Sequence, residues 1–153
     1  MKEFMLEAIK EAKKGVQNGE GGPFGAVVVK DGKIIGRGHN QVVGLNDPTA
    51  HAEIQAIRDA AKNLNDFSLK GCTLYVTAEP CPMCFGAIHW ARIDKVIYGA
   101  TRDDAAEIGF DDSLIYDIIQ GKTKDNVEFI QKYRDECLMV FKEWFEKEDK
   151  ILY

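Results

Sequence analysis

The chain has 153 residues, of which 45% are hydrophobic and 29% are charged, and its formal net charge at pH 7 is −5. This size and balance suit one compact globular domain. The negative net charge gives no overall attraction to a nucleic-acid backbone, and no apolar run resembles a signal peptide or a membrane span. We therefore expect a cytoplasmic domain that binds neither nucleic acid nor a membrane.

Helical and strand patterns alternate along the chain. Apolar residues recur every three or four positions from Met5 to Val16, which predicts an opening helix. The stretch FGAVVVKDGKIIGRGHN, residues 24–40, predicts two strands joined by a tight turn at Asp31 and Gly32. The remaining predicted elements are a helix from about Thr49, a strand over 72–78, a helix over 82–93 and a strand over 95–100. The strand, helix and strand in close succession predict a parallel strand pair.

The C-terminal part of the chain has a different pattern. The polar stretch QGKTKDN, residues 120–126, predicts a hinge, and a short strand is predicted over 127–130. The final predicted helix is acidic and amphipathic. The residues that share its apolar face are Cys137, Val140, Phe141, Trp144 and Phe145. Because no internal repeat or low-complexity segment divides the chain, residues 1–153 are expected to form one domain.

Two of the four cysteines lie one helical turn apart in EPCPMC, residues 79–84. In a reducing compartment, cysteines are poor disulfide candidates. Cys81 and Cys84 follow a predicted strand and open a predicted helix, where backbone N–H groups and the helix dipole stabilise thiolates. This spacing suits a redox dithiol and a metal site equally, so the pair alone leaves both interpretations open. Cys72 and Cys137 lie on predicted buried faces and are interpreted as small apolar residues.

A histidine and a glutamate at the start of the preceding helix favour the metal. Consecutive helix starts in a strand–helix–strand–helix layout meet at one edge of a sheet, so His51 can meet Cys81 and Cys84. One imidazole and two thiolates leave the fourth position of a tetrahedral zinc open, which is typical of a catalytic site. Zinc lowers the pKa of a water in that position, and Glu53, near the metal but not bound to it, can move the proton. The sequence therefore predicts one Zn²⁺ per chain and an enzyme.

Taken together, the two motifs resemble the His-x-Glu and Pro-Cys-x-x-Cys signatures of the cytidine deaminase superfamily. The stretches GGPFGAVVVKDGKII, NDPTAHAEIQAIR, LYVTAEPCPMCFGAIHWARI and AAEIGFDDSLIY are similar to the bacterial guanine deaminases from about Gly21 to Tyr116. The resemblance implies an α/β fold, a three-layer α/β/α sandwich with a central mixed five-stranded sheet, commonly assembled as a homodimer. It also implies zinc-dependent hydrolytic deamination of a purine base, guanine, to xanthine and ammonia.

The resemblance also assigns residues to the base. It aligns Asn40 with a base-binding asparagine, and Phe24 and Trp90 with aromatic walls, although such residues are more often turn or packing residues. The backbone amide of Ala52 is expected to donate to charge that develops during the reaction. Asp112, the second aspartate of GFDDS, matches a residue that guanine deaminases place beside the substrate amine. Aspartates near a helix start ordinarily cap the helix, so Asp112 in this role would favour a purine with an amine at C2.

The chain ends in EKEDKILY, and terminal residues are ordinarily frayed. By resemblance, guanine deaminases end on a tyrosine that covers the bound base. We therefore expect Tyr153 to close the pocket, with residues 127–153 as a domain-swapped segment that reaches the partner subunit. His39 and His89 are expected to be structural or surface residues, because the zinc already has its protein ligands.

Other functions remain open alternatives. A tRNA adenosine deaminase, which the chain resembles through DPTAHAEI and LYVTAEPC, would need a positive surface for RNA, yet the final helix carries more acid than base. A guanosine deaminase would need only a wider pocket. A non-catalytic zinc module would need a filled fourth metal position or no Glu53, and neither condition holds.

Overall fold

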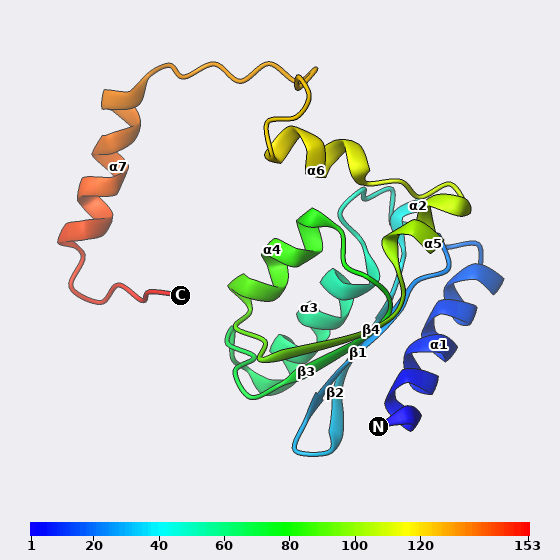
Figure 1. Ribbon diagram of the computed structural model, residues 1–153. Helices are drawn as coiled ribbons and strands as arrows, with labels where there is room; N and C mark the ends of the chain where they lie inside the picture. Colours follow the sequence, from blue (N-terminus) through cyan, green and yellow to red (C-terminus); the bar gives the residue numbers. More distant parts are fainter.

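A mixed four-stranded sheet with helices on both of its faces forms the body of the chain (Figure 1). The computed structural model describes all residues from Met1 to Tyr153. Its strands are β1 (Gly25–Lys30), β2 (Lys33–His39), β3 (Thr73–Ala78) and β4 (Lys95–Ala100). Its helices are α1 (Lys2–Gln17), α2 (Val42–Leu45), α3 (Ala52–Leu64), α4 (Pro82–Trp90), α5 (Arg102–Glu107), α6 (Ser113–Ile119) and α7 (Arg134–Glu146). None of these helices combines the length and apolar character that a membrane crossing needs.

The strands are ordered β2-β1-β3-β4 across the sheet. The predicted hairpin is confirmed, because β1 and β2 pair antiparallel and both turn residues have positive φ, 50° at Asp31 and 76° at Gly32. The predicted parallel pair is also confirmed, since β3 and β4 run parallel with α4 between them in the chain. Strand β1 pairs antiparallel with β3, so the sheet is mixed.

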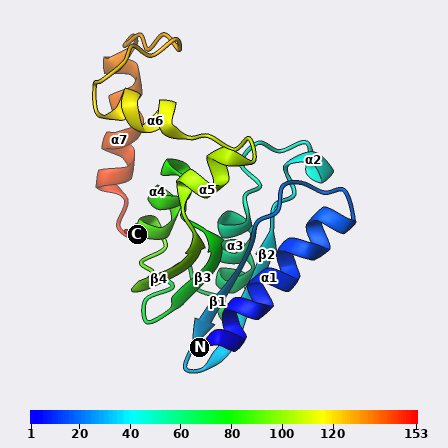
Figure 2. The ribbon, with the colours of Figure 1, turned by 45° about the vertical axis from the view of Figure 1, so that its right-hand side comes forward.

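Buried side chains on the two faces of the sheet form separate cores. Along β1, Ala26 and Val28 face a core shared with α3 and α4, whereas Val27 and Val29 face a core shared with α1. This alternation follows from the two-residue repeat of a strand, and it explains why the strand is apolar throughout. Figures 1 and 2 show α1 on one side of the sheet and α3 with α4 on the other, which gives the expected α/β/α layers.

Helix α3 packs unusually close to β2 because both elements present very small residues. A Cβ atom on Gly38 would lie 2.4 Å from the backbone nitrogen of Ala56 and 2.6 Å from the carbonyl oxygen of Ala52. A Cβ atom on Gly36 would lie 2.6 Å from the carbonyl oxygen of Ala56. The facing residues of α3, Ala52, Ala56 and Ala60, are fully buried. The first turn of α3 is therefore held tightly against the end of β2.

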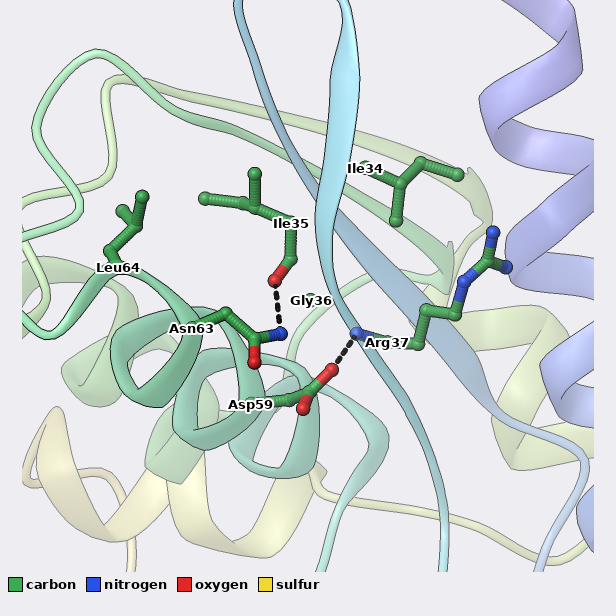
Figure 3. A pocket seen from close by; sticks show the side chains of 7 residues that line it. All are labelled: Ile34, Ile35, Gly36, Arg37, Asp59, Asn63 and Leu64. Carbon is green, nitrogen blue, oxygen red and sulfur yellow. Dashed lines mark hydrogen bonds between the residues drawn. The ribbon is translucent and has the colours of Figure 1, made fainter.

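Strand β2 is an edge of the sheet, and side chains of α3 cover part of its free backbone. Asn63 donates a hydrogen bond to the carbonyl oxygen of Ile35 at 2.8 Å, and Asp59 accepts one from the amide of Arg37 at 2.9 Å (Figure 3). These contacts make the edge a poor template for another strand. The shallow surface hollow between them has a volume of about 380 Å³ and lies toward the far end of α3, away from His51.

The predicted fifth strand is wrong for this chain. The sheet has four strands, and residues 127–130 adopt no regular structure. An extended segment becomes a strand only when a neighbouring strand edge accepts its backbone hydrogen bonds, and residues 120–133 lead away from the sheet (Figure 1). Every residue from 127 to 153, here called the C-terminal arm, is exposed, including the whole of α7.

Candidate active site

Two helix starts bring three metal-binding side chains together. His51 is the N-cap residue of α3, and Cys81 is the N-cap residue of α4, with Cys84 in the first turn of the same helix. The Nδ1 atom of His51 lies 3.5 Å from the Sγ atom of Cys81 and 3.5 Å from that of Cys84. The three donor atoms all lie within 4.8 Å of one another.

This spacing fits a zinc ion. With Zn–S bonds of about 2.3 Å and a Zn–N bond of about 2.0 to 2.1 Å, tetrahedral angles place sulfur and nitrogen about 3.6 Å apart. The separations in the chain are 3.5 Å, so the donors are already at the distances that a shared ion requires. Three protein ligands leave one tetrahedral position for water or substrate, as catalytic zinc sites do.

The two thiols share a hydrogen bond that shifts their pKa values in opposite directions. A hydrogen bond from Cys84 lowers the pKa of Cys81 to about 4, so this sulfur is a thiolate. The same bond, together with burial, raises the pKa of Cys84. A divalent cation that binds all three donors would displace the proton that Cys84 retains in the absence of metal, so metal affinity at this site should depend on pH.

Glu53 lies beside the three donors without being one of them. It is 6% exposed, and burial raises the pKa of its carboxyl group. The charge of Cys81 also raises this pKa, whereas a hydrogen bond with Cys84 and the charge of His51 lower it. A carboxyl group with a raised pKa, close to the metal ligands but outside the ligand set, has the properties of a proton carrier. The role of Glu53 as the proton carrier stays a prediction, and its location beside the three donors permits it.

Asn40 and Ala52 reach the same end of the sheet. Asn40 follows β2 directly and is 6% exposed, and its Oδ1 atom accepts a hydrogen bond from the amide of Val42 at 3.1 Å. This contact fixes the direction of the side-chain amide and leaves its NH₂ group to donate. Ala52 is fully buried as the first residue of α3, next to His51.

Asp112 is the N-cap residue of α6, but its side chain does not cap the helix. Its neighbour Asp111 accepts a hydrogen bond from the amide of Ser113 at 2.9 Å, whereas the side chain of Asp112 makes no capping bond to α6. Burial raises the pKa of Asp112, and the charge of Cys81 adds to the effect, so its carboxyl group lies within electrostatic range of the metal ligands. The ordinary explanation for two adjacent aspartates thus applies to the first of them only.

An aromatic pair adjoins this region. Phe24 contacts Phe110 edge-on, with ring centroids 5.0 Å apart. The sequence interpretation included Phe24 but missed Phe110, although Phe110 stands two residues before Asp112 in the GFDD stretch. It also missed the contacts that tie this stretch to the metal loop. Tyr116 donates a hydrogen bond to the carbonyl oxygen of Pro80 at 3.3 Å, next to Cys81 in the chain.

Trp90 and Tyr153 lie elsewhere within this chain. Trp90 is the last residue of α4 and stands roughly 12 Å along the helix from the ligand at its start. The ring of Tyr153 lies 6.1 Å from that of Trp90 and 6.1 Å from that of Phe67. All three rings are largely exposed. The structure therefore brings Trp90 and Tyr153 to each other but not to the metal ligands of their own chain.

The zinc-binding region of cytidine and deoxycytidylate deaminases matches residues 1–100 of the chain. This chain belongs to that deaminase family. The matched region contains the proposed metal ligands and Glu53, and the family is one of zinc-binding enzymes, so the His51, Cys81 and Cys84 cluster is its zinc site.

Within the deaminase family, the chain is similar to guanine deaminase from Bacillus subtilis, with 51% identity over 142 residues that cover 92% of this chain and 91% of that protein. The crystal structure of guanine deaminase from that organism superposes with a TM-score of 0.92 at 49% identity, over 99% of this chain and 98% of the other. A tRNA-specific adenosine deaminase from Aquifex aeolicus is 52% identical over 100 residues, which cover 65% of this chain and 66% of that one.

Proposed function

We propose that this chain is a zinc-dependent guanine deaminase, which hydrolyses guanine to xanthine and ammonia. The observation that carries the proposal is high identity over nearly the whole chain, together with the superposition on a guanine deaminase crystal structure. The Bacillus subtilis guanine deaminase is 51% identical over 92% of the chain, and its crystal structure superposes over 99% of it. Among tRNA-specific adenosine deaminases, that of Aquifex aeolicus reaches 52% identity over only 65% of the chain, and that of Buchnera aphidicola covers 93% of the chain at only 40% identity.

The chemistry divides between the metal and the side chains. Zinc, when bound, supplies the Lewis acidity that makes water a nucleophile near neutral pH. The carboxylate of Glu53 takes one proton from the attacking water and delivers it to the ring nitrogen beside C2 of guanine. It then carries the second proton, from the new hydroxyl group at C2, to the departing amine, and the C2 carbonyl of xanthine forms as the C–N bond breaks. One water is consumed and one ammonia leaves, so the reaction balances without an oxidant or a reductant.

The remaining residues bind and orient the base. Asn40 donates from its free NH₂ group to an acceptor on the purine edge, and the amide of Ala52 donates to charge that develops in the reaction. Phe24, with Phe110 against it, provides an apolar wall for the ring. The carboxylate of Asp112 accepts a hydrogen bond from the amine at C2, which favours guanine over adenine.

The C-terminal arm supports a domain-swapped homodimer. Its helix α7 carries Met139, Val140, Phe141 and Phe145 with most of each side chain exposed, and β4 is a free sheet edge with an exposed end. An exposed apolar surface of this kind usually packs against another protein surface, and no part of the same chain packs against α7. We infer that this surface packs against a second copy of the chain, with residues 120–126 as the hinge and residues 127–153 as the swapped segment.

Trp90 and Tyr153 acquire a role in this dimer. The two rings lie side by side in one chain, yet both are remote from that chain's metal ligands. If the arm docks on a second copy, it brings Tyr153 to the partner's pocket, and Trp90, which lies beside Tyr153 at the end of α4, is at the same interface, so that both rings close the pocket over the base. We place the homodimer in the cytoplasm. In that reducing compartment the free thiols of Cys72 and Cys137 would stay reduced.

A panel of substrates tests the proposal. Purified protein with one equivalent of zinc is assayed for ammonia release from guanine, guanosine, adenine, cytidine and a tRNA anticodon stem-loop. Guanine should be turned over with the highest kcat/KM. Faster turnover of guanosine would mean that the pocket is open to a ribose, and turnover of the stem-loop alone would replace the proposal with RNA editing.

A further inference from the structure

His39 is a buried polar residue that the proposed chemistry does not use. The polar or charged side chains that are buried in the chain are those of His39, Asn40 and Glu53, with exposures of 8%, 6% and 6%. Asn40 and Glu53 face the proposed pocket. His39 comes directly before Asn40 at the end of β2, so its surroundings bear on where Asn40 lies.

Two carboxylates from different parts of the chain flank the ring of His39. Its Nδ1 atom lies 2.8 Å from Oε2 of Glu11 in α1. Its Nε2 atom lies 3.1 Å from Oε1 of Glu20, within ion-pair range although the N–H does not point directly at that oxygen. Each ring nitrogen thus lies near a carboxylate from a different part of the chain. His39 therefore links α1 to the segment that follows it.

The ring has a fitted place against α1. A Cβ atom on Gly15 would lie 2.7 Å from Cδ2 of His39 and 3.4 Å from the carbonyl oxygen of Asn40. Real Cβ atoms do not approach so closely, so glycine at this helix position is what admits the imidazole. Lys14 and Arg37 line the polar surface above the ring, together with Asp59 and Gln55 of α3.

Glu20 is held at several further points. Its Oε2 atom accepts a hydrogen bond from Nε2 of Gln41 at 2.6 Å, and Gln41 in turn accepts one from Gln55 of α3 at 2.7 Å. The carbonyl oxygen of Glu20 accepts hydrogen bonds from the amides of Val43 and Gly44 at 3.0 and 2.9 Å. The segment that begins at Glu20 is thus fixed to β2, α2 and α3.

The backbone that follows Glu20, at Gly21 and Gly22, packs against the proposed base-binding residues Asn40 and Phe24. A Cβ atom on Gly21 would lie 2.1 Å from Oδ1 of Asn40, so the backbone there touches the side-chain amide directly. A Cβ atom on Gly22 would lie 2.8 Å from the ring of Phe110 and 2.9 Å from that of Phe24. Any displacement of Glu20 would therefore move the backbone that sets the position of Asn40.

We propose that His39 is a positioning residue for the base: clamped between Glu11 and Glu20, it presses the Gly21–Gly22 segment onto Asn40 and so presets the amide that binds the purine. The inference rests on the proposed function, because it assumes that Asn40 contacts the substrate. His39 itself does not touch the base or the metal ligands.

The clamp makes a prediction for the kinetics. In Glu20→Ala and His39→Gln, KM for guanine should rise about tenfold while kcat changes by less than about twofold, because a misplaced Asn40 weakens base binding without altering Glu53 or the zinc. Zinc should remain at one per chain. A merely structural role would lower the melting temperature or the active fraction and leave KM unchanged, and that result would overturn the inference.

Matched variants separate the clamp from general effects. Glu20→Gln keeps an acceptor for Gln41 and His39, so KM should return to nearly the wild-type value. Gly15→Ala favours the helix yet intrudes on the ring, so KM should rise as in His39→Gln. Glu7→Ala, one turn before Glu11 on α1, removes a surface ion pair with Arg37 and should change neither constant. A KM rise in Glu7→Ala as large as that in Glu20→Ala would contradict the inference.

A second readout does not depend on guanine turnover. In the nuclear magnetic resonance spectrum, the Hα protons of Gly21 should show a nuclear Overhauser effect to the side-chain NH₂ of Asn40, which is identified by its loss in Asn40→Asp. The effect should vanish in Glu20→Ala and persist in Glu20→Gln. If the wild type does not deaminate guanine, the proposed function fails and this signal alone decides the clamp. An unchanged signal in Glu20→Ala overturns it.

Discussion

At the scale of single residues, two carboxyl groups near the metal ligands make no contact that stabilises the fold. Glu53 is buried beside the zinc ligands, and the side chain of Asp112 makes no hydrogen bond to the start of α6, whereas that of Asp111 does. Burial of a carboxyl group that has no fixed cationic partner is unfavourable for folding. Such residues are retained where the chemistry requires them, and each therefore makes a separate prediction.

Glu53→Gln should keep the zinc and the fold but reduce kcat by a factor on the order of a hundred or more. Glutamine has a similar shape but cannot accept and release the proton. Metal analysis and steady-state assays on the same preparation measure the two effects together. Turnover close to that of the wild type, with zinc retained, would show that another group moves the proton.

Asp112→Asn should damage guanine deamination by about tenfold to a hundredfold and leave the zinc content unchanged. The amide presents a donor as well as an acceptor to the amine at C2, so the hydrogen bond is weakened or reversed. Asp111→Asn serves as the matched control, since that residue faces the start of α6 rather than the metal loop. If both variants behave alike, Asp112 has no special contact with the base.

The metal ligands could be predicted from the sequence because they depend on local features. His51 and Cys81 are helix N-caps that follow from strand and helix patterns, and the topology places helix starts at one edge. Phe110 and His39 could not be assigned in this way. Their importance comes from contacts with Phe24, Glu11 and Glu20, which are distant in sequence and carry no motif of their own.

At the scale of elements, the approach of α3 to β2 sets the position of the site. The two glycines of β2 remove the side chains that would separate the strand from the helix, and the first turn of α3 carries His51 and Glu53. The periodicity of the sequence predicts both elements but not their spacing, because the spacing depends on which small residues face each other.

Gly38→Ala should therefore lower the free energy of unfolding by about 1 to 3 kcal/mol, because the added methyl group would meet the backbone of Ala52 and Ala56. Urea unfolding measures the change. Gly86→Ala in α4 is the control, since its methyl group would meet no atom within 4 Å. It should be neutral or stabilising by up to about 1 kcal/mol. Equal stability of wild type and Gly38→Ala would mean that the close packing is not required.

The failed strand prediction belongs to this scale as well. Residues 127–130 have strand-forming side chains, and Val127 and Phe129 are 64% and 83% exposed. Side-chain propensity favours an extended backbone for residues 127–130. A strand forms only if another strand of the fold lies beside them and pairs with their backbone. The polar hinge at 120–126 carries the segment away from the sheet, and sequence patterns do not specify the direction in which a hinge leads.

At the scale of the whole molecule, the body and the arm differ in how they are stabilised. The body has a core on each face of the sheet, whereas every residue of the C-terminal arm is exposed. A helix of 13 residues with no buried side chain is marginal in water on its own. The proposed swap accounts for this difference, since the arm would be packed in the dimer.

Complementation between two inactive chains tests the swap. One chain carries Glu53→Ala with an intact tail, and the other is truncated after Lys150. In a swapped dimer, the truncated chain's intact zinc site receives its partner's Tyr153, so subunit exchange should restore activity to about a quarter of the wild-type level. Mixing with a Glu53→Ala chain that is also truncated should restore nothing. If truncation is harmful but mixing never helps, Tyr153 acts within its own chain.

The central claim is that water replaces the amine of guanine at this zinc site. The most direct measurement is a reaction in ¹⁸O-labelled water, followed by mass spectrometry of the purine product and an ammonia assay. The account predicts xanthine with one ¹⁸O atom at C2 and one ammonia per xanthine, at a rate that disappears on removal of zinc and returns when zinc is restored. Unlabelled product, or no xanthine from fully zinc-loaded protein, would contradict the account.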